Sequence, residues 1–315
     1  MKVSSRALVV FAFAALMSLT GCATFEMAKP APVQTQPVAV SFTDEELSGM
    51  NDLPIGTYRV PDSHVIISGH QKGGMGPAVL FGLIGLAVQH AANASAGQEA
   101  VQEIEEALRI NLKEEGQEIA RKLISSERYT KSFRTEVDAA SPSLSVITAV
   151  VMSYVTETDV RPYVVLKASL HDPKTKETVW TTRYFSSNGK TLPLAGEVSW
   201  TANKGEELKR TVSTNLERTV AFMLADVSSP YARDDTKLTM VQGTFPHVPQ
   251  RLQTVGYRLS EDDQTIAFVP KLGDVIVFTG VNLMDKSTTV YRVATKDDEL
   301  LKIIEEPKKE VAAEE

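Results

Sequence analysis

The sequence predicts an α+β fold: an antiparallel sheet covered by two amphipathic helices. Segments 98–126 and 203–224 repeat apolar residues at helical spacing. Between them, runs 144–156, 163–170 and 178–185 have the composition of strands and are joined by short links. Consecutive strands with short links favour antiparallel pairing, and both helices must then bury their apolar stripes against one face of the sheet.

Before this region, the chain begins with the pattern of a secretory signal peptide over residues 1–21. Lys2 and Arg6 precede residues 7–19, which carry no charge. A basic start, a short apolar run and small residues at the end are typical of such a signal. The run is shorter than the roughly 20 residues that a permanent membrane-spanning helix needs, although a retained tethering helix is the alternative.

The residues Leu19-Thr20-Gly21-Cys22 end this segment, and Cys22 is the single cysteine of the chain. They resemble the lipobox of bacterial lipoproteins. In that family the cysteine thiol is alkylated with diacylglycerol, the peptide is cut before the cysteine, and the new amine is acylated, for example with palmitate. Only cysteine supplies a thiolate nucleophile for the thioether. The resemblance implies that Cys22 is lipidated and binds the membrane through its acyl chains.

The residue after the cysteine bears on the compartment. In Gram-negative lipoproteins an Asp at that position resembles an inner-membrane retention mark, and Ala23 stands there instead. We therefore expect the outer membrane, on its periplasmic face. Removal of residues 1–21 leaves 31 basic against 40 acidic residues and changes the net charge from −7 to −9. Such an acidic chain is not expected to bind nucleic acid or anionic headgroups.

The next residues, 22–54, are predicted to be the lipidated N-terminus and an extended tether, because three prolines lie between positions 30 and 37. An α+β domain is expected over 55–228. It begins with two short β-prone runs, 55–60 and 64–68, which the turn signal Pro61-Asp62 separates.

A glycine-rich stretch, 69–77, leads into an apolar segment for which we predict a helix over 75–92. The stretch lacks the Gly-Lys-Ser/Thr ending of a phosphate-binding loop. Gly74, Ala78 and Gly82 recur every four residues, a spacing that lets helix backbones approach closely. Membrane insertion or self-association through this segment is one interpretation, and packing inside the protein's own core is the other.

Two further local features are expected in the α+β domain. Gly116 lies inside the first amphipathic helix, where it indicates a close packing contact or a bend. Asn203 is predicted to cap the second amphipathic helix, with Glu206 three residues later. Trp180 lies on the hairpin between the second and third strands and is expected to be a large core or interface residue.

Residues 237–305 are predicted to form a small all-β domain. Strands are expected at 254–259, 265–269, 274–278 and 288–293, with acidic and glycine-containing turns between them. Residues 306–315 carry many charges and few apolar side chains, so we expect a disordered tail.

The sequence offers little that is typical of catalysis. None of the five histidines lies in a metal-binding pattern, although His64 and His70 are close enough in sequence to share one ion. No Gly-x-Ser-x-Gly elbow occurs, and a lipidated Cys22 could not act as a nucleophile. We therefore expect no metal, no cofactor and no enzymatic activity. A hydrolase stays open as an alternative, because catalytic triads are arranged in space and not in sequence.

The hairpin carries a second resemblance. Leu170-His-Asp-Pro-Lys-Thr175 turns into a strand with Val179-Trp180, which resembles bacterial envelope lipoproteins of the LptE, LpoB and ABC-transport-auxiliary kind. These share a lipobox, a proline-bearing tether and an α+β domain, and they act through surfaces. The apolar Gly/Ala segment and the C-terminal β region do not belong to that pattern, which indicates a separate lipoprotein family.

Together these features predict an outer-membrane-anchored lipoprotein that acts as a non-catalytic periplasmic binding or assembly module for envelope proteins. The expected interaction surface comprises Gly74, Ala78, Gly82 and Trp180. Two alternatives are a protein that binds a lipid or another hydrophobic ligand in a cavity bounded by 75–88, and a membrane-linked assembly that self-associates through helix 75–92.

Overall fold

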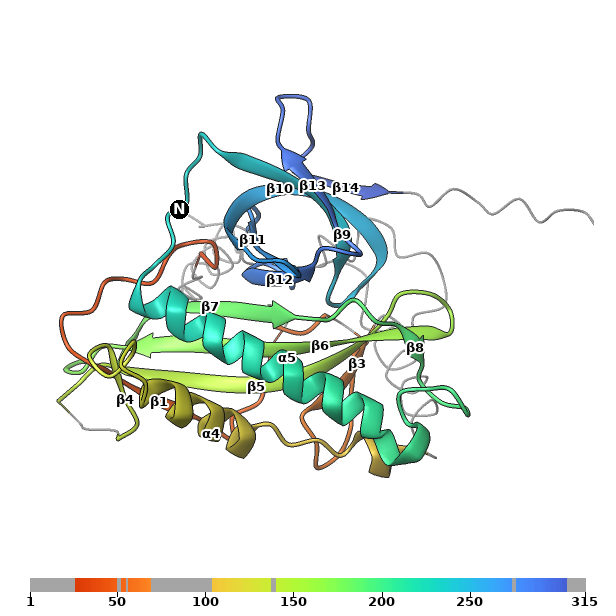
Figure 1. Cartoon of the computed structure of the whole chain (residues 1–315), viewed down its shortest axis with the longest axis horizontal. Helices are drawn as coiled ribbons and strands as arrows, with labels where there is room; N and C mark the ends of the chain where they lie inside the picture. Colours follow the sequence, from red (N-terminus) through yellow and green to blue (C-terminus); the bar gives the residue numbers. More distant parts are fainter. Residues whose placement is uncertain are drawn as a thin grey trace, which may run out of the picture.

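The structure is a computed structural model that describes residues 26–49, 52–54, 56–68, 104–136, 140–273 and 276–304. These residues form a mixed α/β fold with few helices and one large, mostly antiparallel sheet (Figure 1). The prediction of a fold with helices and a mostly antiparallel sheet is confirmed. The signal peptide, Cys22, the apolar segment 75–92 and the tail lie outside the described residues.

The centre of the sheet consists of β5 (Ser143–Tyr154), β6 (Asp159–His171) and β7 (Thr178–Ser186). β6 pairs antiparallel with both neighbours and also with the two-residue β8 (Leu192–Pro193). These are the three strands that the sequence predicts, with β6 and β7 longer than expected and β5 one residue shorter. Their middle residues are buried on both faces, so the sheet needs a cover on each side.

β1 (Val38–Phe42) and β3 (Val65–Ser68) lie end to end along the other edge of β5, and each pairs with β5 in parallel. β4 (Phe133–Arg134) pairs with β1, and β2 (Tyr58–Arg59) pairs with β3. The tether predicted over 22–54 is therefore wrong for residues 38–42. Although prolines precede this run, its side chains are apolar enough to be buried, and it becomes part of the sheet.

Helices α4 (Lys113–Ile124) and α5 (Ala202–Ser228) lie against one face of these strands (Figure 1). Gly116 in α4 makes the expected close contact, because a Cβ there would overlap the ring of Phe42. None of the helices in the described part of the chain is long and apolar enough to span a membrane.

The helix predicted over 98–126 is wrong for residues 104–112, and residues 98–103 lie outside the described residues. A short 3₁₀ turn, η1 (Glu105–Leu108), is followed by non-helical residues 109–112. The Ser63 hydroxyl donates to the Leu108 carbonyl at 2.6 Å and accepts the Ile110 N–H at 3.1 Å. These tertiary bonds satisfy backbone groups that a continuous helix would pair internally, so local helical periodicity is overridden here.

The cap predicted at Asn203 is also wrong. Asn203, Lys204 and Gly205 have φ values of 51°, 57° and 75°, which form a left-handed turn before the regular part of α5. The turn brings Gly205 against η1, where a Cβ would lie 2.7 Å from the Ala107 carbonyl oxygen. Glycine allows both the positive φ and this close backbone approach.

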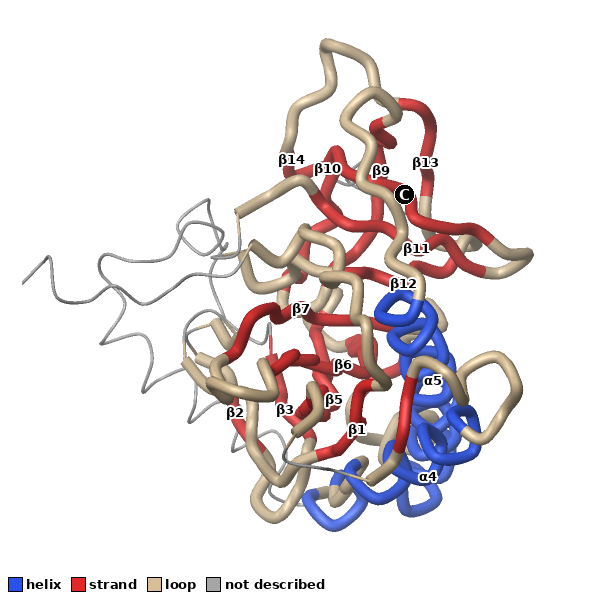
Figure 2. Tube along the Cα trace, turned by 90° about the vertical axis from the view of Figure 1, so that its left-hand side faces the viewer, coloured by secondary structure: helices blue, strands red, loops and turns tan. Residues whose placement is uncertain are grey.

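The C-terminal strands curl into a sheet above the central strands (Figures 1 and 2). They are β9 (Leu238–Phe245), β10 (Val248–Glu261), β11 (Thr265–Pro270), β12 (Val281–Asp285), β13 (Val290–Val293) and β14 (Leu301–Ile304). β12 pairs in parallel with β7, so the C-terminal strands continue the main sheet. The strand predicted at 274–278 is wrong for residues 276–278, because Ile276 and Thr279 take part in successive turns, and residues 274 and 275 lie outside the described residues.

Candidate functional site

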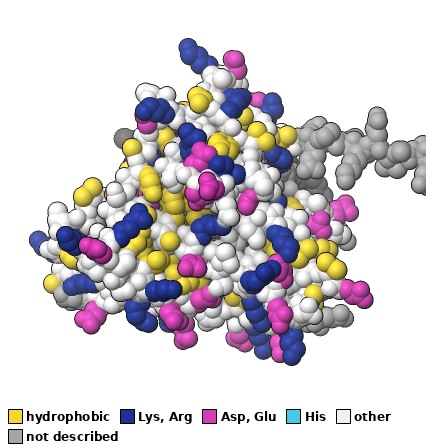
Figure 3. Space-filling model, viewed as in Figure 1, with side chains coloured by type: hydrophobic (Ala, Val, Ile, Leu, Met, Phe, Trp, Pro, Cys, Tyr) yellow, Lys and Arg dark blue, Asp and Glu magenta, His cyan; other side chains and the backbone are white. Residues whose placement is uncertain are grey.

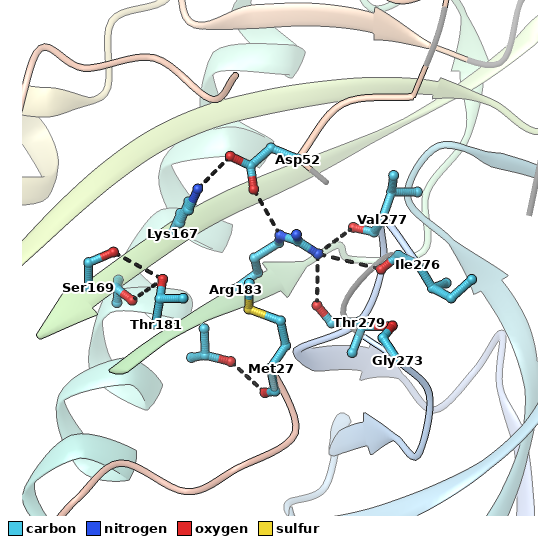
Figure 4. A network of polar contacts seen from close by, with 12 residues as sticks. Met27, Asp52, Lys167, Ser169, Thr181, Arg183, Gly273, Ile276, Val277 and Thr279 are labelled. Atoms are coloured by element: carbon cyan, nitrogen blue, oxygen red, sulfur yellow. Dashed lines mark hydrogen bonds and ion pairs between the residues drawn. The ribbon is translucent and has the colours of Figure 1, made fainter. Parts of the chain in front are cut away.

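The face of the central strands opposite α4 and α5 carries a buried group of charged side chains. Asp52 accepts from Lys167 Nζ at 2.6 Å and from Arg183 Nε at 3.2 Å. Lys167 and Arg183 are register partners on β6 and β7, and so lie side by side on this face (Figure 4). The Asp52 and Arg183 side chains are each no more than 2% exposed.

Arg183 also connects the central strands to the C-terminal strands. Its Nη1 donates to the carbonyl oxygens of Ile276, Val277 and Thr279 at 3.3–3.5 Å, just before β12 (Figure 4). One guanidinium thereby holds a loop from each end of the chain, residues 52–54 and 276–279. The donors of the Arg183 guanidinium face backbone carbonyls and a carboxylate inside the protein. Arg183 and its partners are therefore better explained as stabilising the fold than as a binding site.

A Ser–His cluster lies further along the same face. Ser68 and Ser153 are register partners on β3 and β5, and His247, in the β9–β10 turn, reaches both. Its Nδ1 lies 3.0 Å from Ser68 Oγ, and its backbone N–H donates to Ser153 Oγ at 3.0 Å. Burial, together with the nearby Arg183 charge, lowers the pKa of His247 to about 3.

This cluster is the nearest approach to the hydrolase that the sequence left open. A general base works best with a pKa near the operating pH and needs access to substrate. His247 is 2% exposed, and its lowered pKa makes the imidazole a weak base. Burial and the Arg183 cation lower its pKa, and no carboxylate is among its hydrogen-bond partners in the described residues. The arrangement therefore serves packing rather than proton transfer.

Beside this cluster lies a small polar pocket between β6, β7, β9 and β12. Arg161 lines it, is 9% exposed, and donates from Nη1 to Thr244 Oγ1. Tyr163 Oη donates to the same hydroxyl at 3.2 Å, and Asp285 lines the opposite wall. The cavity volume is about 20 Å³, which admits about one water molecule. A lipid chain does not fit this space.

The first described residues, 26–31, form what we call the N-terminal strap. Its backbone carbonyls accept three hydrogen bonds from distant side chains: Thr182 donates to Met27 at 2.8 Å, Trp180 to Lys29 at 3.2 Å, and Arg233 to Ala28 at 3.2 Å. The side chains of Met27, Ala28 and Ala31 are buried. The predicted tether is therefore docked on the domain at residues 26–31.

A buried carboxylate supports the far side of the strap. Asp226, near the end of α5, accepts from Tyr184 Oη at 3.0 Å and from Arg233 Nη1 at 3.4 Å. Burial, and then the Asp226 charge, raise the pKa of Tyr184 well above its ordinary value, so the phenol stays protonated and donates. The same Arg233 binds Ala28, so α5 and the strap share one guanidinium.

Among the predicted site residues, the structure describes Trp180 and His64. Trp180 is 5% exposed and lies under the strap, which agrees with the core alternative of its prediction. Cys22, Gly74, Ala78 and Gly82 lie outside the described residues. His64 bonds internally, with Nδ1 2.9 Å from Thr148 Oγ1, and burial lowers its pKa, while His70 is not described. The described residues contain no group of three or more His, Cys, Asp or Glu arranged for a metal.

Sequence reasoning missed the Asp52–Arg183 pair and the strap. Asp52 and Arg183 are 131 positions apart, and no local pattern relates them. A signal for the strap was present in Met27, Ala28 and Ala31, small or apolar residues placed as a buried turn would need, but the neighbouring prolines suggested a linker.

Comparisons with known proteins give little further guidance. No family model matches the chain, and no curated protein matches it. Among solved structures, the chain is similar to protein XCC0632 from Xanthomonas campestris, described by the family model DUF330. The identity is 9%, the match covers 65% of this chain and 91% of that chain, and the TM-score is 0.22. A similarity at this TM-score supports no inference about function.

Proposed function

We propose that the chain is a lipoprotein of the outer membrane, anchored through Cys22 and facing the periplasm, that acts as a non-catalytic binding or assembly module for another envelope protein. The observation that carries the proposal is Leu19-Thr20-Gly21-Cys22 at the end of a signal-like apolar run. The lipid supplies the membrane attachment, since a mature chain of net charge −9 is not attracted to anionic headgroups.

The polar side chains of the described part support a binding role over a catalytic one. Asp52, Lys167 and Arg183 are paired with each other, and His247 is buried with a pKa of about 3. The polar pocket at Arg161 has a volume of about 20 Å³, too small for an organic substrate. Such an interior favours a protein that acts through its surface over one that binds a substrate in this polar pocket.

The partner surface of the proposal is the small-residue stripe Gly74, Ala78 and Gly82, now without Trp180, which the strap covers. The proposed architecture includes an apolar helix over 75–92 beside the two amphipathic helices that cover one sheet face. Small residues four apart permit close helix contacts with a partner.

Metabolic labelling with an alkynyl fatty acid tests the anchor. The native chain should incorporate the label, lose residues 1–21 and fractionate with the outer membrane, and the Cys22→Ser variant should do none of these. A purified native chain whose mass shows an unmodified Cys22 contradicts the proposal.

Crosslinking in intact cells tests the partner role. The lipidated native chain should form a specific adduct with another envelope protein, and Gly74→Leu combined with Gly82→Leu should abolish it while labelling of Cys22 is retained. Adducts made of this chain alone would replace the proposal by the self-associating alternative.

A further inference from the structure

The distance between the lipidation site and the folded domain decides how this protein lies on a membrane. Four peptide links separate Cys22 from Glu26, the first described residue. A fully extended chain gains at most about 3.3–3.6 Å per residue, so residue 26 lies within about 14 Å of the lipidated cysteine. The following residues cannot lengthen this connection while the N-terminal strap is docked.

The strap is bound firmly enough to act as part of the domain. It buries three side chains and accepts hydrogen bonds from Thr182 on β7, Trp180 on β7 and Arg233 after α5. Undocking the strap would break these three hydrogen bonds and expose the apolar side chains of Met27, Ala28 and Ala31 to water, and both losses oppose it.

We infer that the lipid anchor and the docked strap together hold one defined side of the domain against the lipid headgroups. This anchor-proximal side comprises the strap, the β6–β7 turn at 172–177 and the connector at 229–237, and Figure 2 looks directly at it. The inference rests on the proposed lipidation of Cys22 and adds to it an orientation, with a bilayer surface as the partner.

The surface chemistry of the anchor-proximal side is compatible with contact with lipid headgroups, but it does not itself bring this side to the membrane. Val33 and Val179 are 82% and 50% exposed there, on the chain just after the strap and at the start of β7. Lys174 and Lys176 in the turn stand beside Asp172 and Glu177, so the charges are mixed. With no strong net charge on this side, the short connection to Cys22 sets the orientation.

The orientation determines how far each end of helix α5 lies from the membrane. Its C-terminal end lies beside the strap, because Asp226 and Ala28 share Arg233, and its N-terminal end points away from it (Figure 1). At about 1.5 Å per residue, Glu206 is about 33 Å from Ser228 along the helix axis. The end of α5 near Glu206 therefore projects into the periplasm and is open to a partner.

A unique thiol label tests the orientation on the lipidated full-length protein. Cys22 is the single cysteine and carries the lipid thioether, so an introduced cysteine is the one reactive thiol. Lys174→Cys and Glu206→Cys are both exposed positions, and each would carry an environment-sensitive fluorophore in vesicles of phosphatidylethanolamine and phosphatidylglycerol. A spin-labelled headgroup should quench the label at position 174 strongly and the label at 206 not at all.

Different measurements test the proposed lipid anchor and the proposed orientation. Vesicle flotation and the mass of the acylated chain report the anchor, so a protein that does not float contradicts the proposed function. A protein that floats but shows equal quenching at positions 174 and 206 overturns the orientation and leaves the anchor intact.

A spacer variant tests the cause. About 20 Gly/Ser residues inserted between Ala23 and Thr24 add a flexible connection of about 25 Å, which should remove the difference between the two labels while flotation persists. If the spacer variant keeps strong quenching at position 174, surface chemistry holds this side against the bilayer, and the inference that the short connection does so is overturned.

Discussion

The two faces of the central strands β5, β6 and β7 are stabilised in different ways. Toward α4 and α5 most of the contacts are apolar, in a cluster that includes Val150, Leu166 and Leu216, and the buried group of Tyr184, Asp226 and Arg233 lies at the C-terminal end of α5. The opposite face has a smaller apolar cluster around Val151 and Phe185 and also buries the charged side chains of Asp52 and Arg183. Apolar packing binds helices that the chain supplies nearby, whereas specific polar contacts bind loops from its two ends.

Apolar contacts and buried charged contacts respond differently to substitution. Apolar contacts are non-directional and tolerate substitution of similar volume. A buried charge requires its partner, because the low-polarity interior penalises an uncompensated ion heavily. Single substitutions should therefore have their largest effects on the polar face and smaller effects on the helix face.

The largest effect is expected for Asp52→Ala. The substitution leaves Arg183, which is 1% exposed, and Lys167 without their carboxylate. The free energy of unfolding should fall by about 3–5 kcal/mol, measured by denaturant unfolding of the chain that begins at Ala23. Asp44→Ala, which removes an exposed partner of Lys113, is the matched control and should cost less than about 1 kcal/mol. Equal effects of the two substitutions would contradict the importance of the polar face.

On the helix face, Leu216→Ala should destabilise the protein by about 3 kcal/mol. Leu216 is fully buried on α5 against the central strands, and its truncation leaves a cavity that the packed neighbours fill incompletely. Leu216→Met conserves most of the volume and should cost under about 1.5 kcal/mol. A loss with Met as large as that with Ala would show that this face depends on shape as strictly as the polar face does.

The pH dependence distinguishes the polar face further. Burial holds the pKa of His247 at about 3, against 6.5 for an unperturbed histidine. Between these values the unfolded chain binds a proton that the folded protein does not, so stability is fully present above about pH 6.5 and is lost as the pH falls. The loss is about 1.4 kcal/mol per pH unit, or about 2 kcal/mol at pH 5.

His247→Gln isolates this contribution. The variant should lose less stability between pH 7 and pH 5 than the native protein does, by about 2 kcal/mol, although it is less stable at pH 7. The lowered pKa of His64 acts in the same direction but is present in both proteins, so it cancels in the difference. Identical pH profiles of the two proteins would contradict a neutral, buried His247.

The helix face was largely predictable from the sequence, and the polar face was not. Strands β5, β6 and β7 and the regular part of α5 follow from local periodicity, because apolar spacing along one segment reports which side is buried. The contacts made by Asp52 and Arg183 join segments that are far apart in the sequence. Local periodicity in a single sequence does not indicate which distant segments come together. The lipobox could be predicted from the sequence alone because the four residues that suggest it are adjacent.

Tertiary contacts also explain where the predicted helix and the predicted linker differ from the structure. The non-helical residues 109–112 look helical in the sequence, but Ser63, from another part of the chain, hydrogen-bonds the Leu108 carbonyl and the Ile110 N–H. β1 looks like the end of a proline-rich linker until β5 offers it a parallel partner. In each case a tertiary contact outweighed a local preference, which on its own amounts to less than about 1 kcal/mol per residue.

The smallest effect expected is that of Trp180→Phe, which removes the indole N–H donor to Lys29 and keeps an aromatic ring in the core. Stability should fall by about 1 kcal/mol, and amide hydrogen exchange should accelerate in the strap. Trp200→Phe is the matched control, because Trp200 is also buried and donates to the Val160 carbonyl at 2.7 Å, away from the strap. It should lower stability comparably without accelerating exchange in the strap. If both variants accelerate that exchange equally, the strap follows global stability, and its separate attachment through Trp180 is contradicted.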